Sequence, residues 1–315
     1  LADIESLADD IITRSEAATR ESIGELTAGT YKASAILDLA DGSIIDIVCA
    51  VIVDPDAGEI TVDYTGSSAA SPWGINVVRN YTHAYTTFTV RSVLNPDIPN
   101  NHGSLEPIKM IAPEGSIVNA VSPQPCTARH VVGMFLPNAL LKALAQIDPD
   151  QAMAEGSGAV WTMQVSGNHD DGDPFITAMF TYAGGVGARA TKDGLNACSY
   201  PTGVAAVPIE VVEASAPIRF TRKALRPGSG GAGAQAGGLG QTIEFSVDTT
   251  RDWQLNAVTS RLTHPPQGIF GGEPGQAGSF RVNGQPVTTQ ARITLTPDDV
   301  VTLELPGGGG YGEAG

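Results

Sequence analysis

The chain has 315 residues, of which 42% are hydrophobic and 17% are charged, and its formal net charge is −16 at pH 7. This length allows a large core and predicts two subdomains. The acidic balance, without any cluster of Lys and Arg, argues against a nucleic acid or an anionic membrane as a partner, because phosphate contacts need basic side chains.

The cysteines and the hydropathy indicate in which cellular compartment the chain is expected. Cys49, Cys126 and Cys198 lie far apart and form no CxxC pair, which disfavours a disulfide framework and a zinc knuckle. Free thiols of this kind favour a reducing, cytoplasmic compartment. No run of 18 uncharged apolar residues occurs, so the sequence predicts no membrane span.

The chain begins with a predicted helix over residues 1–23, in which Leu7, Ile11 and Ile12 recur at helical spacing. β-Branched and alternating segments follow, separated by hairpin signals such as Asp41-Gly42. Strands of an antiparallel meander are expected at residues 31–39, 44–53 and 60–65.

Two further helices are predicted in the first half of the chain. The first covers residues 74–94, where apolar side chains recur near every fourth position. The second is expected to begin with Thr127 as its N-cap and to end at Asp148. Short strands are expected between the two helices, at residues 108–112 and 116–121.

The remaining pattern is mostly that of strands separated by Pro and Gly loops. The sequence therefore predicts an α+β fold that is strand-rich, with a few helices and glycine-rich loops. We expect a mixed region over residues 1–213 and a glycine-rich, mostly β region over residues 214–315. Strands are expected at residues 159–166, 175–182, 204–212, 241–247, 254–259 and 300–305.

Seven glycines fall between Gly228 and Gly240. Glycine permits positive φ and close approach to the backbone, so this segment is either an anion cradle or a flexible linker. The sequence contains neither a GxxxxGK[ST] loop nor a GxGxxG in a βαβ context. We therefore favour a packed glycine loop at a subdomain or subunit interface, with Arg222 or Arg226 as the nearby cation that could meet a phosphate.

Two groups of polar side chains are candidates for chemistry. Arg129 and His130 open a predicted helix, where the dipole favours an anion, so Arg129 could hold a carboxylate or phosphate and His130 could act in acid–base chemistry or bind metal. The alternative is an ion pair to an acidic loop and a local cap. Asn76, Asn80 and His83 share one helical face and could line a polar pocket or simply face solvent.

Two loops carry further histidines. Asn101 and His102 lie in a polar loop, where a histidine is either solvated or functional. His169 lies in an acidic loop, residues 167–173, that lacks EF-hand spacing, and we expect a hairpin tip there.

Short motifs follow one another along nearly the whole chain. In their order they resemble the hydantoinase B/5-oxoprolinase family. The segments that carry the resemblance are Ser15-Glu16 to Arg20, Gly29-Thr30-Tyr31, Asp63 to Ser68, Ile98 to Gly103 with Pro107-Ile108, Ala128-Arg129-His130, Gly184 to Ala188 with Asp193, Gly194 and Asn196, Pro208-Ile209-Glu210, and Ser229 to Gly240.

The resemblance implies the B-type subunit, or the C-terminal half, of an ATP-dependent cyclic-amide hydrolase. Its substrate would be a hydantoin, an N-methylhydantoin or 5-oxoproline. A hydantoinase A-type partner would bind ATP and phosphorylate the amide oxygen, and a divalent metal is expected in the full complex. Family members carry an upstream segment of the type N-D-P-Y-x-G-G-x-H that resembles a metal site, and it does not occur here. We therefore expect a fragment that is inactive alone and has no metal or nucleotide motif of its own.

With the resemblance, the candidate catalytic residues are Arg129, His130 and His102. The candidate substrate-binding residues are Asn76, Asn80, Asn101 and Asn196. Pro125-Cys126-Thr127 stands where many relatives have Val-Asn, so this position departs from the family pattern. Two other functions stay open, namely a subunit of an ATP-dependent ketone carboxylase and a non-catalytic assembly module.

Overall fold

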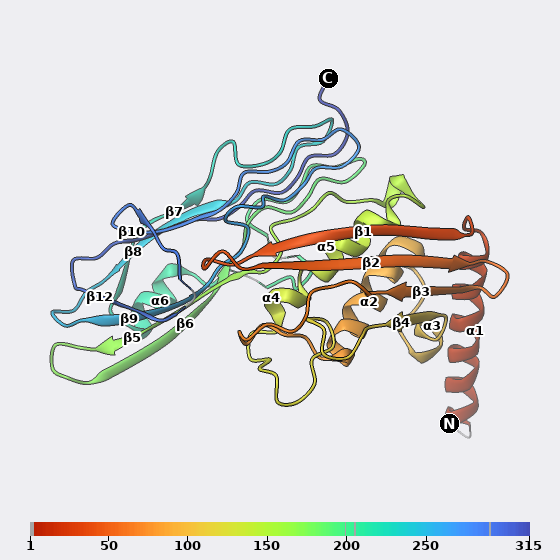
Figure 1. Cartoon of the computed structure of the whole chain (residues 1–315), viewed down its shortest axis with the longest axis horizontal. Coiled ribbons are helices and arrows are strands. Elements are labelled where there is room, and N and C mark those ends of the chain that lie inside the picture. The colour runs from red at the N-terminus through yellow and green to blue at the C-terminus, as the bar shows by residue number, and fades with distance from the viewer. Residues whose placement is uncertain (1–2, 199, 205, 290) are drawn as a thin grey trace. The chain divides into compact units, whose positions relative to one another are not determined.

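The computed structural model describes residues 3–198, 200–204, 206–289 and 291–315 (Figure 1). The chain forms two compact units. Unit 1 comprises Leu1–Ala35 and Asp46–Ala152, and unit 2 comprises Ile36–Ile45 and Met153–Gly315. The expected division at residue 213 does not coincide with this boundary, because strands from both sides of residue 213 share one hydrophobic core in unit 2.

Unit 1 begins with the predicted helix, which is α1, Ile4–Gly24. The Asp3 side chain caps it by accepting a hydrogen bond from the Ser6 N–H at 3.0 Å. Its buried positions Ser15, Thr19 and Ile23 recur every fourth residue and form one stripe. The inward face of α1 is thus partly polar and offers hydroxyl groups to side chains that pack on it.

The sheet of unit 1 contains the three strands of the predicted meander and the short strand predicted at residues 108–112. They are β1, Gly29–Asp38, β2, Ile44–Asp54, β3, Glu59–Asp63, and β4, Ile108–Ile111, paired in that order. β2 and β3 are antiparallel as expected, whereas β3 and β4 are parallel. The connection from β3 to β4 contains α2, Arg79–Leu94, and α3, His102–Leu105, and α2 packs against β4.

The predicted start of one helix and one predicted strand of unit 1 are wrong. The helix expected at residue 74 begins only at Arg79, because residues 71–76 form a loop. Residues 116–121 form turns, with a single bridge between Ala69 and Ser116, in place of the expected strand.

The helix expected from Thr127 to Asp148 is instead two short helices, α4, His130–Gly133, and α5, Leu136–Leu144. Arg129 stands at the N-cap of α4, and no side chain caps that end. Pro137 lies in the first turn of α5, where a residue without an N–H is tolerated and a helix interior would reject it. The predicted periodicity of the segment is therefore right, and the predicted continuity is wrong.

Unit 2 contains two antiparallel sheets with their apolar faces in one core. One sheet has the order β11-β10-β13-β8-β7 and the other β12-β9-β5-β6. Trp161, Phe245 and Trp253 are almost completely buried in this core. The strands are β5, Trp161–Asn168, β6, Pro174–Tyr182, β7, Ile218–Leu225, β8, Gln241–Val247, β9, Trp253–Val258, β10, Ser279–Val282, β11, Gln285–Pro286, β12, Ile293–Leu295, and β13, Val301–Glu304.

The strand expected at residues 204–212 is wrong over its second half. Ile209–Ser215 forms helix α6, and residue 205 lies outside the described residues. Pro208 stands at the N-cap and Glu210 lies in the first turn, where a negative charge stabilises a helix. The hairpin tip expected around His169 is confirmed by backbone hydrogen bonds between His169 and Asp173 and between Gly172 and His169.

The glycine run is part of what we call the glycine layer, a set of extended segments outside the two sheets of unit 2. Figure 1 shows them running side by side near the C-terminus. Backbone bonds join them: the Gly308 N–H donates to the Gly238 carbonyl, and the Gly238 N–H donates to the Val186 carbonyl, each at 2.9 Å. The segments of the layer are residues 184–188, 194–197, 228–240, 267–276 and 305–312.

The glycine layer confirms a packed loop and excludes a flexible linker. A Cβ atom on Gly308 would lie 2.0 Å from the Val186 carbonyl oxygen, and one on Gly237 would lie 1.9 Å from the Gly308 oxygen. The named N–H groups bond to carbonyls, so they are not bare groups that could cradle an anion. Arg226 is tied to the backbone as well, because its guanidinium donates to the Ala277 carbonyl at 2.7 Å.

A buried ion pair lies beside the glycine layer. The Arg261 guanidinium is 2.8 Å from the Glu155 carboxylate, and these side chains are 1% and 2% exposed. The Glu155 carboxylate also accepts from the Gln267 N–H at 3.2 Å. Among the described residues, no helix is long and apolar enough to cross a membrane.

Replacing Gly308 with Ala should destabilise unit 2 by at least about 2 kcal/mol, since overpacking against a fixed backbone displaces both segments. Chemical denaturation of the wild type and the variant measures the difference. Gly156→Ala is the matched control, because a Cβ there would lie 3.5 Å from its nearest neighbour, an ordinary contact. Equal stability losses in the two variants would contradict the close packing of the glycine layer.

Candidate functional site

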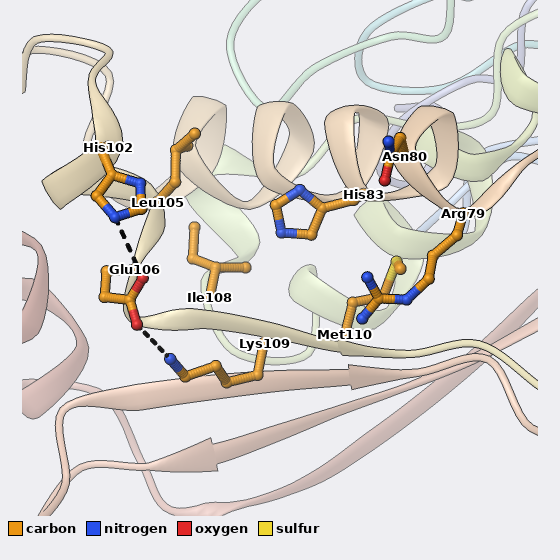
Figure 2. Close-up of a pocket in the computed structure, with 9 residues that line it drawn as sticks. All are labelled: Arg79, Asn80, His83, His102, Leu105, Glu106, Ile108, Lys109 and Met110. Atoms are coloured by element: carbon orange, nitrogen blue, oxygen red, sulfur yellow. Dashed lines mark hydrogen bonds and ion pairs between the residues drawn. The ribbon is translucent and has the colours of Figure 1, made fainter.

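A pocket within unit 1 lies between α2, α3 and β4. Its volume is about 440 Å³. Figure 2 shows its lining side chains, which come from the first turns of α2, from α3 and the residue after it, and from β4. The lining residues are Arg79, Asn80, His83, His102, Leu105, Glu106, Ile108, Lys109 and Met110.

One end of the pocket is an internally compensated charge cluster. Lys109 Nζ lies 3.0 Å from Glu106 Oε1, and His102 Nε2 lies 3.8 Å from Glu106 Oε2 (Figure 2). The hydrogen bond and the charge of Lys109 lower the pKa of Glu106, so its carboxylate stays ionised. His102 itself is 80% exposed.

The other end of the pocket carries Arg79, Asn80 and His83 from α2. Burial, and next the positive charge of Arg79, lower the pKa of His83, so its imidazole is neutral at pH 7. Within the part of the chain that the structure describes, none of these three side chains makes a hydrogen bond to another residue. They are therefore available to a ligand.

Arg129 and His130 lie outside this pocket, and Arg129 contacts a pair of neighbouring tyrosines. The Arg129 Cζ atom is 5.7 Å from the Tyr81 ring centroid, a cation–π contact, and the Tyr81 and Tyr85 ring centroids are 5.0 Å apart. Arg129 is exposed, and His130 is half-buried. Burial, and next the charge of Arg129, lower the pKa of His130. Its imidazole is thus a neutral group that can accept a proton at pH 7.

Asn76 is fully buried, and its amide is engaged with the backbone on both sides of the loop. Its Oδ1 accepts from the Ser71 N–H at 2.7 Å, and its Nδ2 donates to the carbonyls of Ser71, Trp73 and Pro125. Because α2 begins only at Arg79, Asn76 does not share a helical face with Asn80 and His83. The side chain holds residues 71–76 against residue 125.

Asn101 and Asn196 make bonds within their own units. Asn101 caps α3, accepting from the Ser104 N–H at 3.2 Å, and its Nδ2 donates to Ser15 Oγ at 2.7 Å. Asn196 belongs to unit 2, where its Oδ1 accepts from the Leu239 N–H at 2.8 Å and supports the glycine layer. Of the seven site residues predicted from the sequence, Asn80 and His102 are the two that line the pocket.

The prediction did not include Arg79, Glu106 and Lys109. Glu106 and Lys109 were detectable in principle, since three-residue spacing brings opposite charges together in a turn. Arg79 carried no signal, because it sits beside a loop that the periodicity assigned to the helix.

Whether the pocket suits a metal ion depends on the ligand side chains that line it. In the described residues, no group of three or more His, Cys, Asp or Glu side chains is placed to hold a metal ion. The charge cluster at Glu106 has a lysine as its nearest partner, which does not suit a cation. The side chains that line the pocket are therefore not a ligand set that suits a divalent metal.

Comparison with known proteins identifies the family. The Hydantoinase B/oxoprolinase family matches residues 1–314, and the chain belongs to this family. An uncharacterized protein of Methanocaldococcus jannaschii is 34% identical over 261 residues, 81% of this chain and 45% of its own length. The B subunit of a putative D-/L-hydantoinase from a Pseudomonas species is 29% identical over 98% of this chain and 55% of its own length.

The fold is also that of a known enzyme structure. The ATP-dependent caprolactamase of Pseudomonas jessenii has a TM-score of 0.83 at 21% identity, over 99% of this chain and 56% of that one. The chain thus spans about half the length of these proteins. The family is established by the sequence match, and the structural likeness shows the fold.

Replacing Asn76 with Ala should lower the free energy of unfolding by about 3 kcal/mol, because backbone groups of the buried loop lose their partners. Thermal or chemical unfolding measures the change. Asn80→Ala is the control, since Asn80 is exposed, and it should cost no more than about 0.5 kcal/mol. A harmless Asn76→Ala would refute the role of Asn76 in holding the loop.

Replacing Arg79 with Gln should raise the pKa of His83, because the positive charge that disfavours the imidazolium is removed. The pKa should stay below its ordinary value, since burial is the larger cause and persists. An NMR titration of the histidine ring protons measures it. Arg14→Gln, which removes an exposed charge on α1, should leave the His83 pKa unchanged, and an equal shift in both variants would contradict the assignment.

Proposed function

We propose that this chain is part of the B-type subunit, or B-type region, of an ATP-dependent hydrolase that opens a cyclic amide. One observation carries the proposal, namely the family match over residues 1–314. The relative named as the B subunit of a putative hydantoinase, aligned with 98% of the chain, agrees with it. So does the 5-oxoprolinase 1 of Arabidopsis thaliana, which is 29% identical over 86% of this chain and 21% of its own length.

The chemistry explains why the proposal includes ATP and a second protein component. An amide carbon is a poor electrophile, and phosphorylation of the amide oxygen makes it a better one. Water then adds to that carbon and the C–N bond breaks, which releases the amine and leaves an acyl phosphate. A second water cleaves the acyl phosphate to a carboxylate and inorganic phosphate. The sequence of this chain contains no P-loop, so we assign the nucleotide to a hydantoinase A-type partner or domain.

Several residues of unit 1 have properties that suit this reaction. Arg129 would hold an anionic group, because its guanidinium is exposed and lies over the Tyr81 ring. His130 would accept a proton from water, since its lowered pKa keeps the imidazole neutral. His102 is the alternative proton carrier, and Asn80 would bind the substrate amide. Asn76 and Asn101 would support these groups through the loops they hold, and Asn196 would act within unit 2 by supporting the glycine layer.

Hydrolysis is favoured over ketone carboxylation by the level of similarity. The hydantoinase and oxoprolinase relatives match in sequence, at 29% identity for two of them. The nucleotide-free acetone carboxylase structure is 16% identical with a TM-score of 0.79, over 95% of this chain and 47% of that one. That likeness shows a shared fold and does not indicate which substrate this chain's protein uses. A cytoplasmic heteromer with an A-type partner is part of the proposal.

The test uses the longer protein or complex that contains this chain. Hydantoin, N-methylhydantoin, 5-oxoproline and caprolactam are each incubated with ATP and a divalent cation, and the ring-opened product and released phosphate are quantified. ATP-dependent ring opening of at least one cyclic amide is expected. Consumption of ketone with bicarbonate, and none with any amide, would replace the proposal by carboxylation. If a complex that lacks this chain turns over normally, the chain has no catalytic role, and the alternative of a non-catalytic assembly module replaces the proposal.

Replacing Arg129 with Ala, or His130 with Gln, should lower kcat of the assembled enzyme roughly 100-fold, the usual size of a lost proton-transfer or anion-orienting group. Steady-state kinetics with the accepted amide measures this, and sizing chromatography confirms assembly. Arg14→Gln serves as the charge-matched control on unit 1 and should turn over normally. Activity within a few-fold of wild type would remove the substituted residue from the proposed site.

A further inference from the structure

The pocket between α2, α3 and β4 has an unbalanced charge. Its permanent cations are Arg79 and Lys109, and its single carboxylate is Glu106. Lys109 and Glu106 neutralise each other at 3.0 Å. Arg79 is left without a counter-ion among the residues that the structure describes, although the chain as a whole carries a net charge of −16. Arg79 therefore attracts anions, because an anion that binds beside an uncompensated cation is stabilised electrostatically.

The groups around Arg79 match an oxyanion with two acceptor atoms. A guanidinium presents parallel N–H groups that fit a carboxylate in a bidentate manner. Asn80 adds an amide donor, and His83 follows one helical turn later. In Figure 2 the Arg79 guanidinium and the His83 imidazole are turned toward the same space, and Met110 overlaps the guanidinium in this view.

The remaining wall of the pocket is apolar. Leu105, Ile108 and Met110 line it between the Arg79 end and the Glu106 end, and Ile108 is buried. A fully hydrated anion such as sulfate or phosphate would gain nothing from these side chains. A ligand with a hydrocarbon part would remove their surface from water and gain binding energy.

From this juxtaposition we propose that the pocket binds a small carboxylic acid. Its carboxylate is held by Arg79 with Asn80 and His83, and its apolar body lies on Leu105, Ile108 and Met110. The volume of about 440 Å³ suits a small molecule of this kind. The inference concerns a binding equilibrium, so it holds whatever reaction the whole protein catalyses.

The test measures binding of acetate, butyrate and hexanoate to the intact protein without ATP, by calorimetry and by the NMR signal of the His83 ring. Affinity should rise about three- to fourfold with each added methylene group. The His83 signal should shift on binding, which places the ligand in this pocket. Sulfate should bind more weakly than butyrate, and butylamine should not move the His83 signal.

Substitutions separate the charge from the rest of the site. Arg79→Gln should weaken butyrate binding at least about tenfold, the usual effect of losing a charged hydrogen-bond donor. Arg79→Lys should retain part of the affinity, since it keeps the charge without the fork. Arg14→Gln should bind as wild type. Arg79 is exposed at the first position of α2, so these variants are expected to fold.

The pH dependence has a defined sign. The titratable and charged groups at the pocket are Arg79 and His83 on α2, His102 and Glu106 on and after α3, and Lys109 on β4. Protonation of the His83 imidazole adds positive charge, whereas the ligand carboxylate stays ionised above about pH 5.5. Because the pKa of His83 is lowered, butyrate should bind more tightly as the pH falls from about 6.5 to about 5.5.

Three results would overturn the proposal. They are an Arg79→Gln variant that binds butyrate as wild type does, sulfate binding more tightly than hexanoate, and a His83 signal that responds equally to butylamine. None of these readouts involves turnover. A failure of ring-opening activity with intact butyrate binding would therefore reject the proposed function alone, and the reverse result would reject this site alone.

Discussion

Contact of glycine backbone with glycine backbone is the constraint on which unit 2 depends. Val186, Gly238 and Gly308 come from three distant parts of the sequence, yet a chain of N–H···O=C bonds at 2.9 Å joins them. A single Cβ at Gly308 would lie 2.0 Å from a carbonyl oxygen. The layer thus replaces the side-chain interdigitation of an ordinary core with backbone hydrogen bonds, which are directional and tolerate little displacement. Each segment can make these bonds only when the others are in place.

The buried pair of Arg261 and Glu155 fits this requirement for a unique arrangement. Two charges removed from water gain little net stability, and their main effect is to penalise any arrangement that separates them. Here the same residue connects the pair with the glycine layer, because the Glu155 carbonyl accepts the Gly309 N–H at 2.9 Å. Arg261 takes a positive φ of 60°, which is unusual for a residue with a side chain. The ion pair and the backbone conformation that presents it therefore fix the same segment.

The sequence predicted the parts of the fold that depend on periodicity. Strands such as β2 and β8 alternate along their length, and their side chains decide their place directly. Prediction failed where a single side chain bonds the backbone of another segment. Asn76 has the spacing of a helical face with Asn80, but its amide bonds hold it in a loop, and α2 begins three residues later. Short motifs could be recognised from the sequence because they are local. The hydrogen-bond partners of each asparagine lie in other segments, so only the structure identifies them.

The two units differ in where their titratable side chains lie and in how far backbone contacts replace side-chain packing. His83, His102 and His130 all lie in unit 1, and at two of them burial and a neighbouring arginine lower the pKa of the imidazole. The histidines of unit 2 are engaged locally: His169 packs on Phe175 in a hairpin, and His264 bonds to Thr263. A unit whose segments touch through glycine has few side chains to spare for chemistry. Titratable groups in a family with this layer are therefore expected on the other unit, where helices carry them on faces that the core does not occupy.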